Sequence, residues 1–176
     1  MHQQGFSVEP QYLSIAIWLT GGAGGNPLSA SFIQFIFQYY KDKSLTHHPR
    51  KRFGQNFLRD RQVIDAIIAS LDLQHDDAVV EIGPGRGALT TPLLARLDAL
   101  TVIEIDRDLA AALARSGNTR LTILCQDVLQ SDFQALSATA GSTLRIVGNL
   151  PYNISTPLLL RLTHSHKALC DVHVML

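Results

Sequence analysis

The sequence has no excess of charge of either sign. Its 176 residues include 15 Lys and Arg and 15 Asp and Glu, so the formal net charge at neutral pH is zero. A strong overall charge would have favoured a polyanionic partner, and the composition gives no such indication. Any nucleic-acid partner would therefore have to be bound by a local cluster of basic residues.

Cysteine is scarce as well. Cys125 and Cys170 lie far apart and lack the spacing of a metal-binding pair. This favours reduced thiols in a cytosolic protein over a disulfide. The seven histidines have no carboxylate or cysteine placed to complete a ligand set, so we expect no metal centre.

No apolar run is long enough to span a bilayer. The best candidate, Leu13–Leu19, reads LSIAIWL and is much shorter than the roughly 20 residues of a membrane-spanning helix. It has no basic leader and is followed by GGAGG, which also argues against a signal peptide. We expect a cytoplasmic protein with no part in the membrane.

The sequence does contain enough apolar residues to build a core. Hydrophobic residues make up 46% of the chain and charged residues 17%, as in an ordinary globular protein. The pattern changes near residue 48, because residues 1–48 have apolar bursts but no sustained period. We expect 1–48 to be a poorly ordered extension, of the kind that a start site assigned too far upstream would produce. A segment that binds a partner or a membrane surface is the alternative.

From residue 49 to residue 176, strand-like runs alternate with helical patterns. Apolar residues at 63, 64, 67, 68 and 71 have the spacing of a helix within 59–73. Further helices are predicted at 88–97, 106–116 and 156–165, and strands at 78–82, 101–105, 121–127, 144–149 and 171–176. This alternation is typical of an α/β fold with a parallel sheet and right-handed crossovers.

One spacing locates a candidate site. Gly83, Glu104, Asp127 and Asn149 are separated by 21, 23 and 22 residues, and each lies at or just past the end of a predicted strand. Equivalent ends of parallel strands meet at one edge of the sheet, where ligands bind. The sequence therefore predicts a ligand site at this edge.

The first predicted strand ends in a glycine-rich turn. Glu81–Gly87 reads EIGPGRG, and glycines let a backbone approach a ligand closely while the helix that follows offers free N–H groups. The spacing is not the G-x-G-x-x-G of dinucleotide sites, and no Lys-Ser/Thr pair of a phosphate-binding loop follows. A tight turn without a ligand is the alternative interpretation.

Carboxylates lie at the ends of the next two predicted strands. Glu104 comes about 20 residues after the glycine turn, where an acid can accept hydrogen bonds from ribose hydroxyls. By its spacing, Asp106 is an equally plausible acceptor for the ribose hydroxyls. Alternatively, Asp106 and Asp108 could stabilise the N-terminus of the next helix. Asp127 is placed to accept a hydrogen bond from an adenine amino group, or to cap a turn. Together they predict a pocket for an adenosine-containing cofactor.

The fourth predicted strand ends in GNLPY, which resembles the catalytic motif of adenine-N6 methyltransferases that use S-adenosylmethionine. In that family the Asn oxygen and a neighbouring backbone carbonyl accept hydrogen bonds from the target amine, and the aromatic residue stacks on the base. Pro151 offers no N–H and restricts Leu150 to an extended conformation, which helps to aim carbonyls into a pocket. The resemblance implies a catalytic role for Asn149, Leu150, Pro151 and Tyr152.

Over residues 49–176 the chain resembles the ribosomal RNA adenine dimethyltransferases of the kasugamycin-resistance family. The matching motifs are RKRFGQNFL, VVEIGPGRGALT, VIEIDRDL, QDV and GNLPYNISTPLL. The resemblance implies a Rossmann-like methyltransferase fold and dimethylation of two adjacent adenines near the 3′ end of small-subunit (16S) rRNA during ribosome biogenesis. It also implies a monomer that acts on the small ribosomal subunit and binds S-adenosylmethionine through Asn56, Leu58, Gly83, Glu104, Asp127 and Asn149.

The family pattern continues beyond the fifth predicted strand, with further strands and a C-terminal helical domain. We therefore expect a partial domain, truncated after the fifth strand, whose activity is open. A non-catalytic RNA-binding protein that keeps the pocket, and a 23S rRNA methyltransferase, are the alternatives. The one compact basic cluster, Arg50, Lys51 and Arg52, is predicted to contact RNA phosphates, with a solvated face at a helix entry as the alternative.

Overall fold

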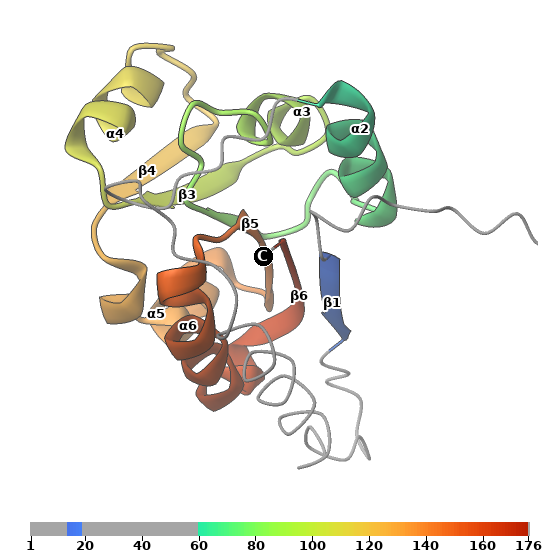
Figure 1. Ribbon diagram of the computed structural model, residues 1–176, viewed down its shortest axis with the longest axis vertical. Coiled ribbons are helices and arrows are strands. Elements are labelled where there is room, and N and C mark those ends of the chain that lie inside the picture. The colour runs from blue at the N-terminus through green and yellow to red at the C-terminus, as the bar shows by residue number, and fades with distance from the viewer. Residues whose placement is uncertain (1–13, 19–59, 176) are drawn as a thin grey trace, which may run out of the picture.

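The computed structural model describes residues 14–18 and 60–175, which form one six-stranded sheet in the order β1-β6-β5-β2-β3-β4 (Figure 1). All neighbouring strands from β6 to β4 are parallel, whereas β1 runs antiparallel to β6. The predicted α/β fold with five parallel strands is confirmed. The strands are β1 (Ser14–Trp18), β2 (Val79–Ile82), β3 (Leu100–Glu104), β4 (Leu121–Cys125), β5 (Leu144–Asn149) and β6 (Leu169–Met175).

Helices cover both faces of the sheet (Figure 1). One face carries α2 (Arg61–Ser70), α3 (Thr90–Leu94) and α4 (Arg107–Ala114), and the other carries η1 (Val128–Gln130), α5 (Phe133–Ala140), α6 (Tyr152–His164) and η2 (His166–Ala168). No helix within the described ranges is long and apolar enough to cross a membrane.

Each face of the sheet has its own hydrophobic core. In β2, Val79 packs with Leu93 of α3, while Val80 packs on the opposite side with Leu158 of α6. Because successive side chains of a strand point to opposite faces, a strand covered on both faces is mostly apolar, and Glu81 is the one charged residue in β2. Full burial of such a side chain contributes about 1.5–3 kcal/mol.

Local signals set the helix boundaries. Asp60 caps α2 by accepting hydrogen bonds from the N–H groups of Gln62 and Val63 at 2.9 and 3.3 Å. The sequence pattern did not predict α5, which is capped by Asp132 and ends at Gly141 with φ 70°. This helix is short, and its hydrophobic period alone is too brief to be recognised.

Two predicted helices have different bounds in the structure. The helix expected at 88–97 contracts to the five residues of α3, whose N-cap position, Leu89, makes no side-chain capping hydrogen bond. The helix expected at 156–165 starts earlier, at Tyr152, because Pro151 takes the N-cap position with φ −68° and ψ 140°. The earlier start joins the end of β5 almost directly to α6.

The first strand, β1, was not predicted from the sequence. All five of its residues pair with β6, from Ser14 opposite Met175 to Trp18 opposite Asp171. Figure 1 shows β1 beside β6 at the edge of the sheet. The pairing joins segments more than 150 residues apart, which no local pattern in the sequence can indicate.

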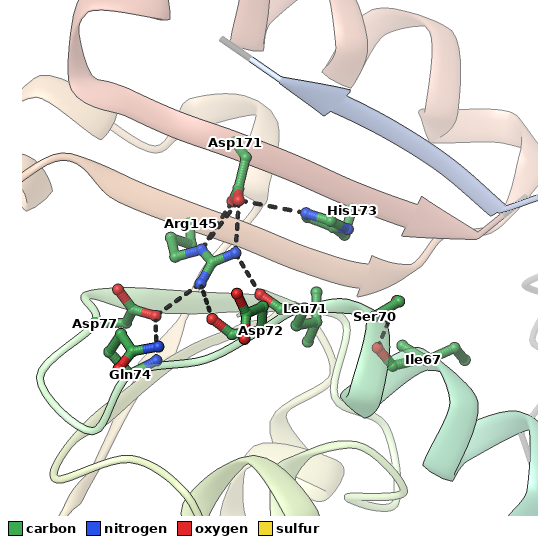
Figure 2. A network of polar contacts seen from close by, with 9 residues as sticks. All are labelled: Ile67, Ser70, Leu71, Asp72, Gln74, Asp77, Arg145, Asp171 and His173. Atoms are coloured by element: carbon green, nitrogen blue, oxygen red, sulfur yellow. Dashed lines mark hydrogen bonds and ion pairs between the residues drawn. The ribbon is translucent and has the colours of Figure 1, made fainter. Parts of the chain in front are cut away.

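At the amino-terminal ends of β5 and β6, Arg145 organises a buried polar network (Figure 2). Its Nη2 donates to Asp171 Oδ2 at 2.7 Å, and its Nη1 donates to Asp77 Oδ2 at 2.7 Å and to the Asp72 carbonyl at 3.4 Å. Nη2 also donates to the carbonyl of Leu71. The network ties the loop between α2 and β2 to the sheet, at the end opposite Asn149.

Burial and hydrogen bonding act against each other on the charges of this network. Desolvation lowers the pKa of Arg145, but hydrogen bonds to Asp171 and Asp77 outweigh it and raise that pKa overall. Desolvation raises the pKa of Asp171, but hydrogen bonds from His173 and Arg145 outweigh it and lower that pKa overall. Both groups are therefore held in their charged forms inside the protein.

Candidate functional site

The four positions identified by their spacing lie at the carboxyl-terminal edge of adjacent parallel strands. Gly83 follows β2, Glu104 ends β3, Asp127 follows β4 and Asn149 ends β5. Ile82 of β2 is the register partner of both Ile103 in β3 and Gly148 in β5. The structure therefore places these positions along one edge.

Three residues of the glycine-rich turn have backbone angles that favour glycine. Gly83, Gly85 and Gly87 have φ values of 65°, 56° and 83°, which side-chain-bearing residues rarely adopt. Among the described residues, no atom lies within 4 Å of the point where a Cβ on Gly83 would be. The described part of the chain therefore leaves the space beside Gly83 unfilled.

Glu104 is buried, with 4% of its surface exposed, and it holds the turn. Its Oε2 accepts the N–H of Gly85 at 3.0 Å, and its Oε1 accepts the N–H of Asp106 at 3.0 Å. Each carboxylate oxygen can accept a second hydrogen bond. Asp106, the alternative by spacing, caps α4 by accepting from the N–H groups of Asp108 and Leu109.

Asp127 occupies the N-cap position of η1. Its Oδ1 accepts the N–H of Leu129 at 2.9 Å, so the turn-capping role considered from the sequence is present in the structure. That hydrogen bond uses one of the two carboxylate oxygens. The other oxygen, Oδ2, could accept a hydrogen bond from a ligand while Oδ1 caps η1.

The predicted catalytic motif, Asn149–Tyr152, links the end of β5 to the start of α6. The Leu150 side chain is buried at 4% exposure, and its N–H donates to the carbonyl of Met175 at 2.9 Å. The carbonyl of Pro151 accepts from Ile154 N and Ser155 Oγ at 3.1 and 3.0 Å. Tyr152, by contrast, is 52% exposed as the first residue of α6. The segment combines a fixed backbone with an exposed aromatic ring.

Gly148 allows this segment to lie close to the glycine turn. A Cβ at Gly148 would lie 2.7 Å from the carbonyl oxygen of Ile82, closer than real Cβ contacts. Ile82 directly precedes Gly83, and Gly148 directly precedes Asn149. The lack of a side chain at Gly148 therefore keeps the two halves of the candidate site adjacent.

Sequence reasoning missed two residues at this edge. Glu81 is 2% exposed and accepts a 2.7 Å hydrogen bond from Thr90 Oγ1. Burial raises its pKa to about 7, against the lowering effect of that hydrogen bond. The signal was a carboxylate inside the otherwise apolar run VVEI. Ile105, expected to lie within a strand, instead follows β3 and is 67% exposed.

Several predicted site residues lie outside the described ranges. These are the cofactor residues Asn56 and Leu58 and the basic cluster Arg50, Lys51 and Arg52. Their roles remain predictions from the resemblance and the charge pattern. The described part of the site comprises the glycine turn, Glu104, Asp127 and the motif from Asn149 to Tyr152.

Most of the chain is similar to known proteins. The family model described as ribosomal RNA adenine dimethylase matches residues 46–176. Ribosomal RNA small subunit methyltransferase A of Pectobacterium atrosepticum is 54% identical over 132 residues, which are 74% of this chain and 48% of that protein. The Yersinia pestis protein of the same name matches with the same values. The chain spans about half the length of these relatives.

Two solved structures share the fold. A dimethyladenosine transferase from Plasmodium falciparum superposes with a TM-score of 0.54 at 28% identity, covering 65% of this chain and 40% of that one. The 23S rRNA methyltransferase ErmE superposes with a TM-score of 0.52 at 34% identity, covering 59% of this chain and 41% of that one. From its match to the family model over most of its length, the chain belongs to the ribosomal RNA adenine dimethylase family.

Proposed function

We propose that this protein dimethylates the N6 amino groups of two adjacent adenines near the 3′ end of small-subunit rRNA, with S-adenosylmethionine as methyl donor. The observation that carries the proposal is the pairing of Gly148 in β5 with Ile82 in β2, because the Asn149–Tyr152 motif then begins beside the glycine turn. The 54% identity to small-subunit enzymes supports this substrate over 23S rRNA, since the 23S enzyme is 34% identical.

The residues present fit S-adenosylmethionine. The open space at Gly83 admits a ligand close to the backbone, and Glu104 can accept ribose hydroxyls with its remaining lone pairs. Asp127 can accept the adenine amino group through Oδ2, and the exposed Ile105 offers an apolar surface for the adenine ring. Asn56 and Leu58 complete the proposed cofactor contacts. When bound, this cofactor supplies a methyl group already activated by its sulfonium.

The motif at the end of β5 is suited to hold the target amine. The side-chain oxygen of Asn149 and the carbonyl of Leu150 are the proposed acceptors, because the carbonyl of Pro151 is engaged within the first turn of α6. An amine conjugated to a purine is a poor nucleophile, and acceptors that favour a pyramidal nitrogen make its lone pair available. Tyr152 presents a ring on which an extruded base can stack. Proximity and orientation then provide much of the acceleration.

The proposed partner is the small ribosomal subunit, bound by a monomer in the cytoplasm. Arg50, Lys51 and Arg52 would contact RNA phosphates, and binding would then weaken as salt concentration rises. In this proposal residues 49–176 form part of the methyltransferase domain, and residues 1–48 form an extension that contributes β1 to the edge of its sheet.

A methyl-transfer assay with tritiated cofactor on under-methylated small subunits tests the proposal, with the Pectobacterium atrosepticum relative as positive control. We expect transfer that Asn149→Ala abolishes while cofactor affinity, measured by calorimetry, falls only modestly. Normal turnover of this variant would rule out the amine-holding role. Because the chain spans about half of its relatives, a non-catalytic RNA-binding protein is the second candidate. Cofactor binding with no transfer would favour it.

A further inference from the structure

Glu81 is a buried carboxylate that the proposed reaction does not use. It lies in β2 with 2% of its surface exposed, and its register partners are Val102 of β3 and Val147 of β5. Its Oε2 accepts a 2.7 Å hydrogen bond from Thr90 Oγ1. The other residues of β2 are apolar, and burying an ionisable group among apolar side chains costs free energy. A carboxylate at this position therefore calls for a functional explanation.

The side of the sheet that Glu81 faces is the side that Glu104 faces. Val79 and Glu81 point to the same face of β2 because successive side chains alternate, and Val79 packs in the core beneath α3. Val102 of β3 belongs to the same core, so Glu104, two residues later, also points to this face. The charge of Glu104 adds to the effect of burial, which raises the pKa of Glu81 to about 7. The two carboxylates therefore interact electrostatically.

The other charged or titratable residues on this side are exposed, or belong to the network around Arg145. α3, which supplies Thr90, carries no charged residue. Those exposed on α2, the glycine turn and α4 are Arg61, Asp65, Arg86, Arg107 and Asp108. Arg145 of β5 lies at the opposite end of the strand, paired with Asp77 and Asp171, and His173 of β6 is two strands away beside Asp171. Glu104 is the charge that acts most directly on Glu81.

The strand order places Glu81 beneath the charged part of the proposed cofactor. In the proposed site Asp127, after β4, accepts from the adenine, and Glu104, at the end of β3, accepts from the ribose. The next strand along the sheet is β2, and β5 follows, with Asn149 at its end. A molecule held in this order has its sulfonium and its amino-acid part between the ribose and the target amine, at the end of β2. Glu81 lies in β2, two residues before the glycine turn begins.

We propose that Glu81 determines specificity for S-adenosylmethionine over its demethylated product, S-adenosylhomocysteine, by the charge of its carboxylate. The inference rests on the proposed function. When the methyl group leaves, its bonding electron pair stays on sulfur, which turns a sulfonium cation into an uncharged thioether. A buried carboxylate attracts a nearby cation more strongly than a neutral group. The ionised Glu81 therefore favours the methyl donor and lets the product dissociate more readily after transfer.

This arrangement predicts that donor binding depends on pH. Because the pKa of Glu81 is raised to about 7, part of the protein carries a protonated Glu81 near neutral pH. A bound cation favours the ionised form, so donor binding releases a proton and donor affinity increases as pH rises. An opposite charge nearby lowers a carboxyl pKa by about 1–3, so we expect donor affinity to increase roughly fivefold or more between about pH 5.5 and 7.5. The product should show a smaller dependence.

Calorimetric titration of the full chain with each of the two compounds tests the inference, and buffers of different ionisation enthalpy report the released proton. Glu81→Gln keeps an acceptor for Thr90 but has no charge. In this variant the ratio of donor to product affinity at about pH 7.5 should fall roughly fivefold or more, and the proton release should disappear. Asp108→Asn is the matched control, because it removes the same charge from an exposed position in the first turn of α4. This control should leave the ratio unchanged.

Thr90→Val gives a second, independent test. The hydrogen bond from Thr90 lowers the pKa of Glu81, so its removal should move the midpoint of the donor's pH dependence to higher pH, and Thr90→Ser should restore it. An unchanged affinity ratio in Glu81→Gln, or proton release that persists in that variant, would overturn this inference alone. Binding of neither compound by the parent would overturn the proposed function together with it.

Discussion

The N–H of Gly85 donates a 3.0 Å hydrogen bond to Oε2 of Glu104, which joins the glycine turn after β2 to the end of β3. The same carboxylate accepts the N–H of Asp106, so its two oxygens are fixed in orientation. A carboxylate held in this way is preorganised to accept ligand hydroxyls without reordering. Glu104 therefore both supports the turn and belongs to the proposed cofactor site.

Glu104→Gln should lower the affinity for S-adenosylmethionine. The amide can accept on one side only, and hydrogen bonds to a charged acceptor contribute more than neutral ones, so we expect a loss of about tenfold to a hundredfold. Asp106→Asn is the matched control, because Asn also caps a helix and Asp106 is engaged at the start of α4. Calorimetric titration measures both. Equal losses in the two variants would refute the assignment of Glu104.

Tyr152→Ala should slow methyl transfer to under-methylated small subunits, whereas Tyr152→Phe should retain it. The exposed ring at the start of α6 offers a stacking face, and stacking is worth about 1–3 kcal/mol per base. We expect the Ala variant to be about tenfold to a hundredfold slower in single-turnover measurements. A phenylalanine variant as slow as the alanine variant would point to the hydroxyl and against stacking.

Glu81→Gln should change how stability depends on pH. The folded-state pKa of Glu81 is raised from 4.5 to about 7 by burial, so the folded protein binds this proton more tightly than the unfolded chain. This contribution is fully present below pH 4.5 and is lost as pH rises to about 7, by up to about 3 kcal/mol. Urea unfolding of the parent at several pH values should show the decline, and Glu81→Gln should reduce it. The same slope in both proteins would show that another group titrates.

Arg145→Met should destabilise the protein strongly without directly altering the candidate site. Removing the guanidinium leaves Asp171 and Asp77 without their cationic partner, and breaking a buried ion pair costs about 3–5 kcal/mol. Arg61→Met is the control, since Arg61 is 93% exposed and lies 4.0 Å from Asp65, so we expect a change below about 1 kcal/mol. Denaturant unfolding compares them. Similar losses in both would mean that the buried network adds little.

Gly148→Ala should disturb both stability and transfer. The added methyl would lie 2.7 Å from the backbone oxygen of Ile82, and such overpacking costs about 1–3 kcal/mol. Gly117→Ala is the comparison, because Gly117 has φ 63° but open space around it, so the substitution strains the local backbone alone. At a temperature where both are folded, only Gly148→Ala should slow transfer. Equal activity in the two variants would show that the spacing of β2 and β5 does not position Asn149.

The sequence by itself determined the parallel sheet and the edge at which the site lies. Strand–helix alternation has a local period, and the near-constant spacing from Gly83 to Asn149 follows from strand and helix lengths. The local chemistry of glycine, proline and aspartate likewise indicated the turns and several caps. These features depend on neighbours in the chain, which a sequence displays directly.

Only the tertiary structure decided features that depend on contacts between distant residues. The sequence did not indicate the hydrogen-bond partners of Glu104 and Asp106. In the structure Glu104 accepts the N–H of Gly85, 19 residues away, whereas Asp106 caps its own helix. The raised pKa of Glu81 required its burial in the folded protein, where it lies against Thr90 of α3. The pairing of β1 with β6 rests on backbone hydrogen bonds, which any sequence with free N–H and C=O groups can form. Contacts between distant residues produce no periodic pattern in the sequence, so they can be identified only in the folded structure.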